Sequence, residues 1–175
     1  MKINQLVAKM IDQELSELHV ALPAKIEKYD PKKMIAEVTL LAKKKLGDEE
    51  KIIPPVLKVP VAHLNAGPFI IRPPYEKEDK VQVLFNERAL DKLLITGEPE
   101  SVEYKRKHSF DDAVVIKGLK TEQEANLPRE ETDSLYLANT DTNSRVFIRK
   151  NGDIIANNET SQAEMIKDGD IKINT

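Results

Sequence analysis

The chain of 175 residues contains no cysteine and no tryptophan, and aromatic residues make up only 5% of it. Without cysteine there is no disulfide, no thiol nucleophile and no zinc site built on thiolates. No apolar run approaches the roughly 18–20 residues of a membrane-spanning helix. Asn4, Gln5, Lys9 and Asp12 interrupt any signal-peptide core at the N-terminus. We therefore expect a soluble product, folded and assembled in a reducing cytosol.

Motifs of common catalytic sites are also missing. The chain has no Gly-x-Ser-x-Gly, no Gly-x-x-x-x-Gly-Lys-Ser/Thr and no Gly-x-Gly-x-x-Gly sequence. The carboxylates of Asp111 and Asp112, and the acidic cluster of Glu98, Glu100 and Glu103, would allow an acid/base pair for glycoside hydrolysis. A turn at Asp111 and a solvated loop at the glutamates are the simpler interpretation. We expect no catalytic, cofactor-binding or metal-binding residue, and so neither enzyme activity nor a small-molecule substrate.

The formal net charge of -3 gives no overall attraction to nucleic acid. Few aromatic side chains are available on which bases could stack. The basic run at residues 105–107 is predicted to be a solvated loop or to form salt bridges. A nucleic-acid partner is therefore not expected.

Apolar residues at helical spacing predict an amphipathic helix over residues 3–18. The stripe consists of Ile3, Leu6, Val7, Met10, Ile11, Leu15 and Leu18. Two interpretations stay open: the stripe packs on its own domain, or it docks on a partner.

The next hundred residues are β-rich. Residues 34–41 alternate in polarity, as in a strand with one buried face. Pro54, Pro55 and Pro60 indicate an extended segment at the edge of a sheet. The charged run at residues 43–51 is predicted to be a loop, and residues 87–94 a short helix. About five strands with one intervening helix predict a small closed barrel of the oligonucleotide/oligosaccharide-binding type.

The tail contains a repeat. Residues 150–157 (KNGDIIAN) are followed about 17 residues later by residues 167–174 (KDGDIKIN), each a turn signal before a short strand. Chance recurrence of a common hairpin signal is the alternative. Two such units cannot bury an apolar face within one chain, because a repeat stack generally needs at least three. The sequence therefore predicts that identical neighbours supply the missing partners, most simply as a threefold cyclic assembly.

Several segments together resemble a known family, in an order and spacing that any one of them alone would not specify. The segments are residues 21–26 (ALPAKI), 59–61 (VPV), 84–91 (LFNERALD), 108–113 (HSFDDA) and 118–119 (GL). In these the chain resembles the central spike, or membrane-puncturing protein, of a contractile phage tail baseplate. Similar proteins occur in tail-derived bacteriocins and other contractile injection systems.

The resemblance implies a homotrimer that pierces the host cell envelope when the sheath contracts. Its location would be the virion, at the tip of the tail baseplate or of an equivalent injection particle. Many spikes of this kind hold an apical iron with a His-x-His pair. Here His19, His63 and His108 all lie before the tail and no His-x-His occurs, so an apical iron is not expected.

The resulting prediction is a mainly β protein of four parts. They are an N-terminal helix (1–19), a five-stranded OB-like barrel (20–119), a linker (120–133) and an intertwined trimeric β-helix or β-prism needle (134–175). Its partners would be two further copies, the tail hub and other baseplate proteins, and the host envelope.

Two groups of residues are predicted to make the contacts. Needle contacts are assigned to Phe147, Ile148, Ile154, Ile155, Ile171 and Ile173, and hub contacts to Ile3, Leu6, Val7, Met10 and Ile11. The rival functions are a tail-hub adaptor without a puncturing role, an envelope-degrading enzyme and a single-stranded nucleic-acid-binding module.

Overall fold

The computed structural model describes residues 3–16, 18–46, 49–99, 106–124, 132–167 and 169–174. The chain divides into two compact units, Met1–Lys120 (unit 1) and Thr121–Thr175 (unit 2). Part of the predicted linker, residues 125–131, lies outside the described residues.

Unit 1 is built on one curled antiparallel sheet with the strand order β5-β2-β1-β8-β9. Its strands are β1 (Ala21–Asp30), β2 (Ile35–Leu40), β5 (Val56–Pro60), β8 (Lys80–Phe85) and β9 (Ala113–Gly118). Along β2 and β8 every second residue is buried, because alternate side chains of a strand point to the same face. The inward face forms one hydrophobic core. Its buried residues are Ala24, Ile26, Ala36, Val38, Leu40, Val59, Val61, Val81, Val83, Phe85, Ala113 and Val115.

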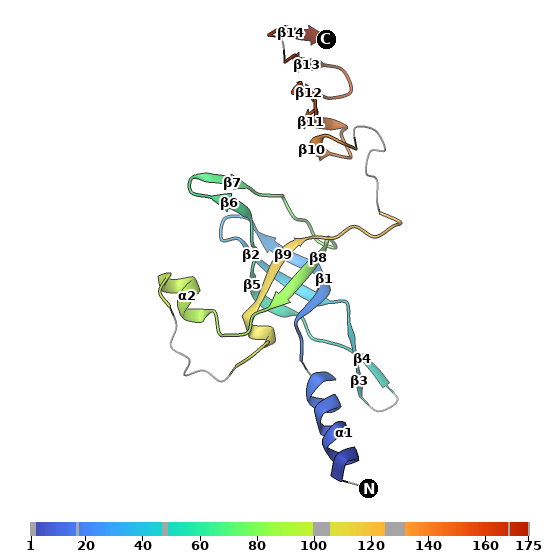
Figure 1. Cartoon of the computed structure of the whole chain (residues 1–175), viewed down its shortest axis with the longest axis vertical. Coiled ribbons are helices and arrows are strands. Elements are labelled where there is room, and N and C mark those ends of the chain that lie inside the picture. The colour runs from blue at the N-terminus through green and yellow to red at the C-terminus, as the bar shows by residue number, and fades with distance from the viewer. Residues whose placement is uncertain are drawn as a thin grey trace. The chain divides into compact units, whose positions relative to one another are not determined.

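The sheet curls until its two edges approach each other. Val61, directly after β5, forms a parallel bridge with Val115 of β9. The backbone N–H of Ala62 donates to the carbonyl of Val115 at 2.8 Å. Figure 1 shows this curled half-barrel, and it confirms the mainly β fold that the alternating pattern predicts.

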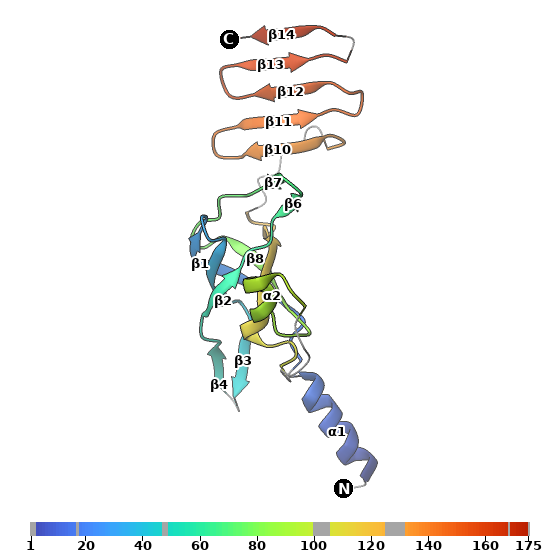
Figure 2. The same ribbon diagram turned by 90° about the vertical axis from the view of Figure 1, so that its left-hand side faces the viewer.

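Two predictions for unit 1 need correction. The charged run at 43–51 is not a loop, because β3 (Lys43–Leu46) and β4 (Glu49–Ile52) pair as an antiparallel hairpin. The short helix α2 (Asp91–Thr96) begins later than the predicted 87–94 and is capped by Gly97, whose φ of 72° suits glycine. A further hairpin of β6 (Leu64–Ala66) and β7 (Phe69–Ile71) projects from the same side of the sheet as α2 (Figures 1 and 2).

The predicted N-terminal helix is present as α1 (Ile3–Ser16). Its residues 3–15 are all exposed, so the stripe does not pack on its own domain. No helix among the described residues is long and apolar enough to cross a membrane.

Unit 2 is a five-stranded antiparallel meander in which each strand pairs with the next along the chain (Figure 2). The strands are β10 (Leu135–Asn139), β11 (Ser144–Ile148), β12 (Ile154–Asn157), β13 (Gln162–Met165) and β14 (Ile171–Asn174). Each has only four or five residues. The described part of unit 2 is thus a small single sheet.

Candidate functional site

One face of the unit 2 sheet is apolar from β10 to β14. Paired residues on neighbouring strands share a face, so the strand register sorts the side chains into rows. Row 1 consists of Leu135, Ile148, Ile154, Met165 and Ile171. Row 2, two residues away on each strand, consists of Leu137, Val146, Ala156, Ala163 and Ile173. Rows 1 and 2 together are called the apolar face.

Unit 2 itself leaves the apolar face largely uncovered. Leu135, Ile171 and Ile173 expose 66%, 69% and 72% of their surface. The other large side chains of the face are also exposed, apart from the half-buried Ile154. Apolar surface gains about 25 cal/mol per Å2 when it is removed from water, and a contiguous exposed patch marks an interaction site. The apolar face is therefore the main candidate site of unit 2.

The opposite face, called the mixed face, is covered by the chain's own side chains. Phe147 and Ile155 pair across β11 and β12 and are only 5% and 2% exposed. The ring of Tyr136 stacks on that of Phe147 with their centroids 6.2 Å apart. The Arg149 guanidinium lies 5.6 Å from the Phe147 ring centroid, and its Nη1 is 3.6 Å from Oε1 of Glu164. The mixed face thus has a small core of its own.

The six residues predicted to form the needle contacts are divided between these faces. Ile148, Ile154, Ile171 and Ile173 lie on the apolar face, whereas Phe147 and Ile155 lie on the mixed face. Sequence reasoning also missed four large members of the apolar face, namely Leu135, Leu137, Val146 and Met165. The alternation of Leu135 with Leu137, and of Val146 with Ile148, was the available signal.

The sequence repeat is confirmed as two turns with the same hydrogen bonds. Gly152 N–H donates to the Arg149 carbonyl, and Gly169 N–H donates to the Ile166 carbonyl, each at 2.9 Å. The φ angles of Gly152 and Gly169 are 100° and 101°. Residues with a side chain rarely adopt this region, so the glycines are required for the turn geometry. Both turns, between β11 and β12 and between β13 and β14, lie on the same side of the meander, as Figure 2 shows.

The side chain of Asp153 joins the first turn to the second. Its Oδ1 accepts a hydrogen bond from Lys167 N–H at 3.1 Å. Its Oδ2 accepts one from Asn151 Nδ2 at 2.8 Å, and Asn151 Oδ1 accepts one from Asp153 N–H. The Lys167 N–H, followed by the Asn151 amide, lowers the pKa of the Asp153 carboxyl below its usual value. The ionised carboxylate therefore stabilises the stacking of successive hairpins.

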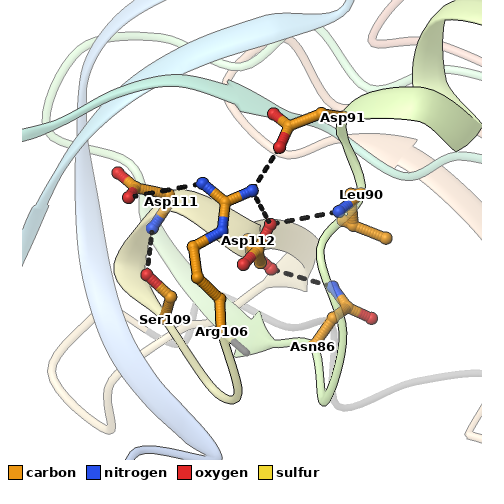
Figure 3. A network of polar contacts seen from close by, with 7 residues as sticks. All are labelled: Asn86, Leu90, Asp91, Arg106, Ser109, Asp111 and Asp112. Atoms are coloured by element: carbon orange, nitrogen blue, oxygen red, sulfur yellow. Dashed lines mark hydrogen bonds and ion pairs between the residues drawn. The ribbon is translucent and has the colours of Figure 1, made fainter. Parts of the chain in front are cut away.

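A polar network in unit 1 surrounds Arg106 (Figure 3). The guanidinium forms an ion pair with Asp91 at short range. Its Nη1 is 3.7 Å from Oδ2 of Asp111, and its Nη2 is 3.4 Å from Oδ1 of the buried Asp112. Oδ1 of Asp112 also accepts a hydrogen bond from Leu90 N–H at 3.0 Å. The pKa of Arg106 is raised, and the largest cause is its side-chain hydrogen bond to Asp91.

This network connects the segment that carries α2 to the start of β9. Asn86 Nδ2 donates to the backbone carbonyl of Asp112 at 2.9 Å. The hydroxyl of Ser109 accepts from Asp111 N–H and caps a short 3-10 helix, Phe110–Asp112. Both carboxylates proposed above as a possible acid/base pair thus face a guanidinium in a turn. The geometry supports the interpretation of Asp111 and Asp112 as structural residues.

Several of the other candidate residues lie outside the described part of the chain. Of the acidic cluster, Glu100 and Glu103 lie outside the described residues, as does Lys105 of the basic run. Across the described ranges, no group of three or more His, Asp or Glu side chains is placed to hold a metal ion.

The side chains assigned to hub contacts are solvent-exposed on α1. Ile3 is 76% exposed, and Leu6, Val7, Met10 and Ile11 are between 43% and 59% exposed. The stripe is an unpartnered apolar surface on unit 1.

We predict that acid weakens the β11–β14 part of unit 2 through Asp153. A carboxylate with a lowered folded-state pKa contributes its stabilisation above the unfolded pKa of about 3.9 and loses it as the pH falls through the folded value. Wild-type unit 2 should therefore melt at a lower temperature at pH 3 than at pH 7. In Asp153→Asn this pH dependence should shrink, as measured by thermal unfolding. Asp170→Asn, at the matching position of the second repeat, is the control, and an equal effect there would refute the assignment.

We predict that Arg106→Ala destabilises unit 1, because the buried Asp112 loses its guanidinium partner. Urea unfolding should show a lower midpoint than for Lys107→Ala, which removes an exposed cation from the next position. Adding Asp112→Asn to Arg106→Ala should recover part of the loss, since the buried charge is then removed. A double variant less stable than Arg106→Ala alone would contradict this role.

Comparison with known families places residues 22–118 in the family described as Phage protein Gp138 N-terminal domain. The match covers the sheet of unit 1 and more than half of the 175 residues. A search of curated proteins gave no match. The family match confirms that the chain resembles a phage protein, as the sequence predicted in finer detail. It supports a structural role in a phage particle. The chain belongs to the Phage protein Gp138 N-terminal domain family.

Proposed function

We propose that this protein is the central spike of a contractile-tail baseplate, a homotrimer that pierces the host envelope when the sheath contracts. Its role is mechanical: the protein transmits force and breaks no bond. Membership in a phage protein family supports this proposal at a coarse level. The puncturing role rests on the resemblance described above and on the apolar face.

The apolar face is the observation that carries the proposal. A sheet with one exposed apolar face is expected to bury that face against another surface. On the mixed face, Phe147 and Ile155 are already buried within the chain. Within the described part of unit 2 this leaves the apolar face to be covered, and further copies of the chain supply a matching apolar surface without any other protein. Three copies around one axis would enclose their apolar faces in a triangular prism.

Such a prism suits a piercing tip. Its interior would contain the exposed aliphatic side chains of rows 1 and 2. Its outer surface would be the mixed face, whose Arg149–Glu164 ion pair is compatible with water. Because interiors of packed side chains resist compression, a closed prism is stiffer than three separate sheets.

We assign attachment to the stripe of α1. Its exposed side chains form an apolar strip along one helix face, and such strips commonly dock in a partner's groove. The partner would be the tail hub, and this contact would hold the spike in the baseplate at the tip of the virion. A tail-hub adaptor would share this contact but would not depend on a rigid tip.

We predict that the protein has a solution mass about three times its chain mass of 19.8 kDa. Ile171→Asp should weaken association about 10- to 150-fold, because it removes an isoleucine from the interface. Light scattering over a dilution series measures both. The matched control is Lys172→Asp on the mixed face of the same strand. A wild-type monomer at micromolar concentration, or equal effects of the two substitutions, would refute the assembly.

We further predict a functional difference in whole particles that carry Ile171→Asp. A spike with a weakened tip should still allow particles to assemble and bind cells, while the number of productive infections falls. Plaque counts per assembled particle measure this, with Lys172→Asp particles as the control. Unchanged infectivity with a dissociated unit 2 would favour the adaptor.

A further inference from the structure

The two rows of the apolar face differ in height. Every position of row 1 carries a large aliphatic side chain, so row 1 forms a continuous ridge. Row 2 carries larger side chains on β10, β11 and β14, but its positions on β12 and β13 are Ala156 and Ala163. On these strands a large residue lies two positions from a small one: Ile154 beside Ala156, and Met165 beside Ala163.

The small residues leave a groove beside the ridge. Its floor includes Val146, Ala156 and Ala163, and Leu137 and Ile173 lie towards its ends. The residues of row 1 do not line it. On its far side are polar groups, namely Asn139, Ser144, Asn158 and Ser161. An apolar floor with one polar wall suits an apolar ridge that packs in from the opposite side.

We propose that the ridge of one copy of this chain occupies the groove of the next copy. The ridge supplies Ile154 and Met165 as the side chains that fill the space above Ala156 and Ala163 of the neighbour. Close packing of this kind matches large residues to small ones across an interface. This inference rests on the proposed self-assembly and specifies which side chains meet.

The pairing also fixes the direction of the symmetry axis. Rotation about an axis parallel to the rows leaves the position of every residue along that axis unchanged, so β12 meets β12 and β13 meets β13. Ile154 of one copy then faces Ala156 of the next, and Met165 faces Ala163. Rotation about an axis parallel to the strands would place ridge against ridge. The fit thus favours a cyclic assembly whose rotation axis is parallel to the rows. It does not fix the number of copies, which is three under the proposed function.

The first test exchanges side-chain volume. Filling the groove with Ala156→Leu and Ala163→Leu should weaken association about 10- to 100-fold, because overpacked interfaces are strained. Adding Ile154→Ala and Met165→Ala moves the ridge to row 2 and should restore association to within about tenfold of the wild type. Lys172→Leu, which adds a leucine on the mixed face outside the groove, should change nothing. Sedimentation over a dilution series measures each association constant. If the variant with all four substitutions associates no more tightly than the variant with the two leucines alone, the proposal is overturned.

A second test does not depend on how well the filled variants fold. Because the chain has no cysteine, Met165→Cys and Ala163→Cys can be introduced in separate, differently tagged chains that are co-expressed. Under mild oxidation, the proposal predicts disulfides between the two kinds of chain in excess of those between two Met165→Cys chains. Mainly like-with-like disulfides, or none in an assembled oligomer, would overturn it.

The outcomes also separate this inference from the proposed function. Mixed disulfides in a dimer would support the ridge and groove but refute the threefold spike. A trimer without mixed disulfides would leave the spike intact and refute the ridge and groove. A monomer that forms no disulfides would refute both.

Discussion

A single antiparallel sheet has two faces, and the described residues of unit 2 cover only one of them. On the mixed face Phe147 and Ile155 are buried, and Tyr136 and Arg149 lie against the Phe147 ring. The apolar face has no such cover, although it carries most of the large aliphatic side chains of the unit. Ordering each residue costs about 1–2 kcal/mol of backbone entropy. Burial in the small core of the mixed face offsets only part of that cost. The proposed assembly, the proposed axis and the proposed mechanical role all rest on this one uncovered face.

The sequence repeat determines which side chains reach the uncovered face, because it sets the geometry of the turns. Gly152 and Gly169 give the two turns the same backbone geometry, and the Asp153 carboxylate ties one turn to the other. Successive strands are thereby held in a register that lines up rows 1 and 2. A slip of one residue would move every apolar side chain to the opposite face. The polar turns at the ends of the strands thus decide which side chains reach the apolar face.

Sequence reasoning predicted the sheet of unit 1 well, because β2 and β8 alternate strictly between buried and half-buried positions. It missed the β3–β4 hairpin, since lysines and glutamates gave no apolar period to read. In the tail, Phe147 adjoins Ile148, and Ile154 adjoins Ile155. With two apolar neighbours, alternation does not reveal which face each side chain takes, so only the register could separate them. Arg106 pairs with Asp91, 15 residues before it, and with the nearby Asp111 and Asp112, and no helical or strand period links these positions.

The two units differ in what they require from neighbours. The curled sheet of unit 1 encloses its own core, from Ala24 to Val115, and the bridge between Val61 and Val115 joins its two edges. A unit with a complete core gains little from association except where it exposes apolar surface, as on α1. In unit 2 the situation is reversed, because its largest apolar surface is exposed. The free energy of self-association should therefore come mainly from rows 1 and 2, while the exposed helix of unit 1 remains available for a different partner. Attachment and self-assembly can then be separated by substitutions in different parts of one chain.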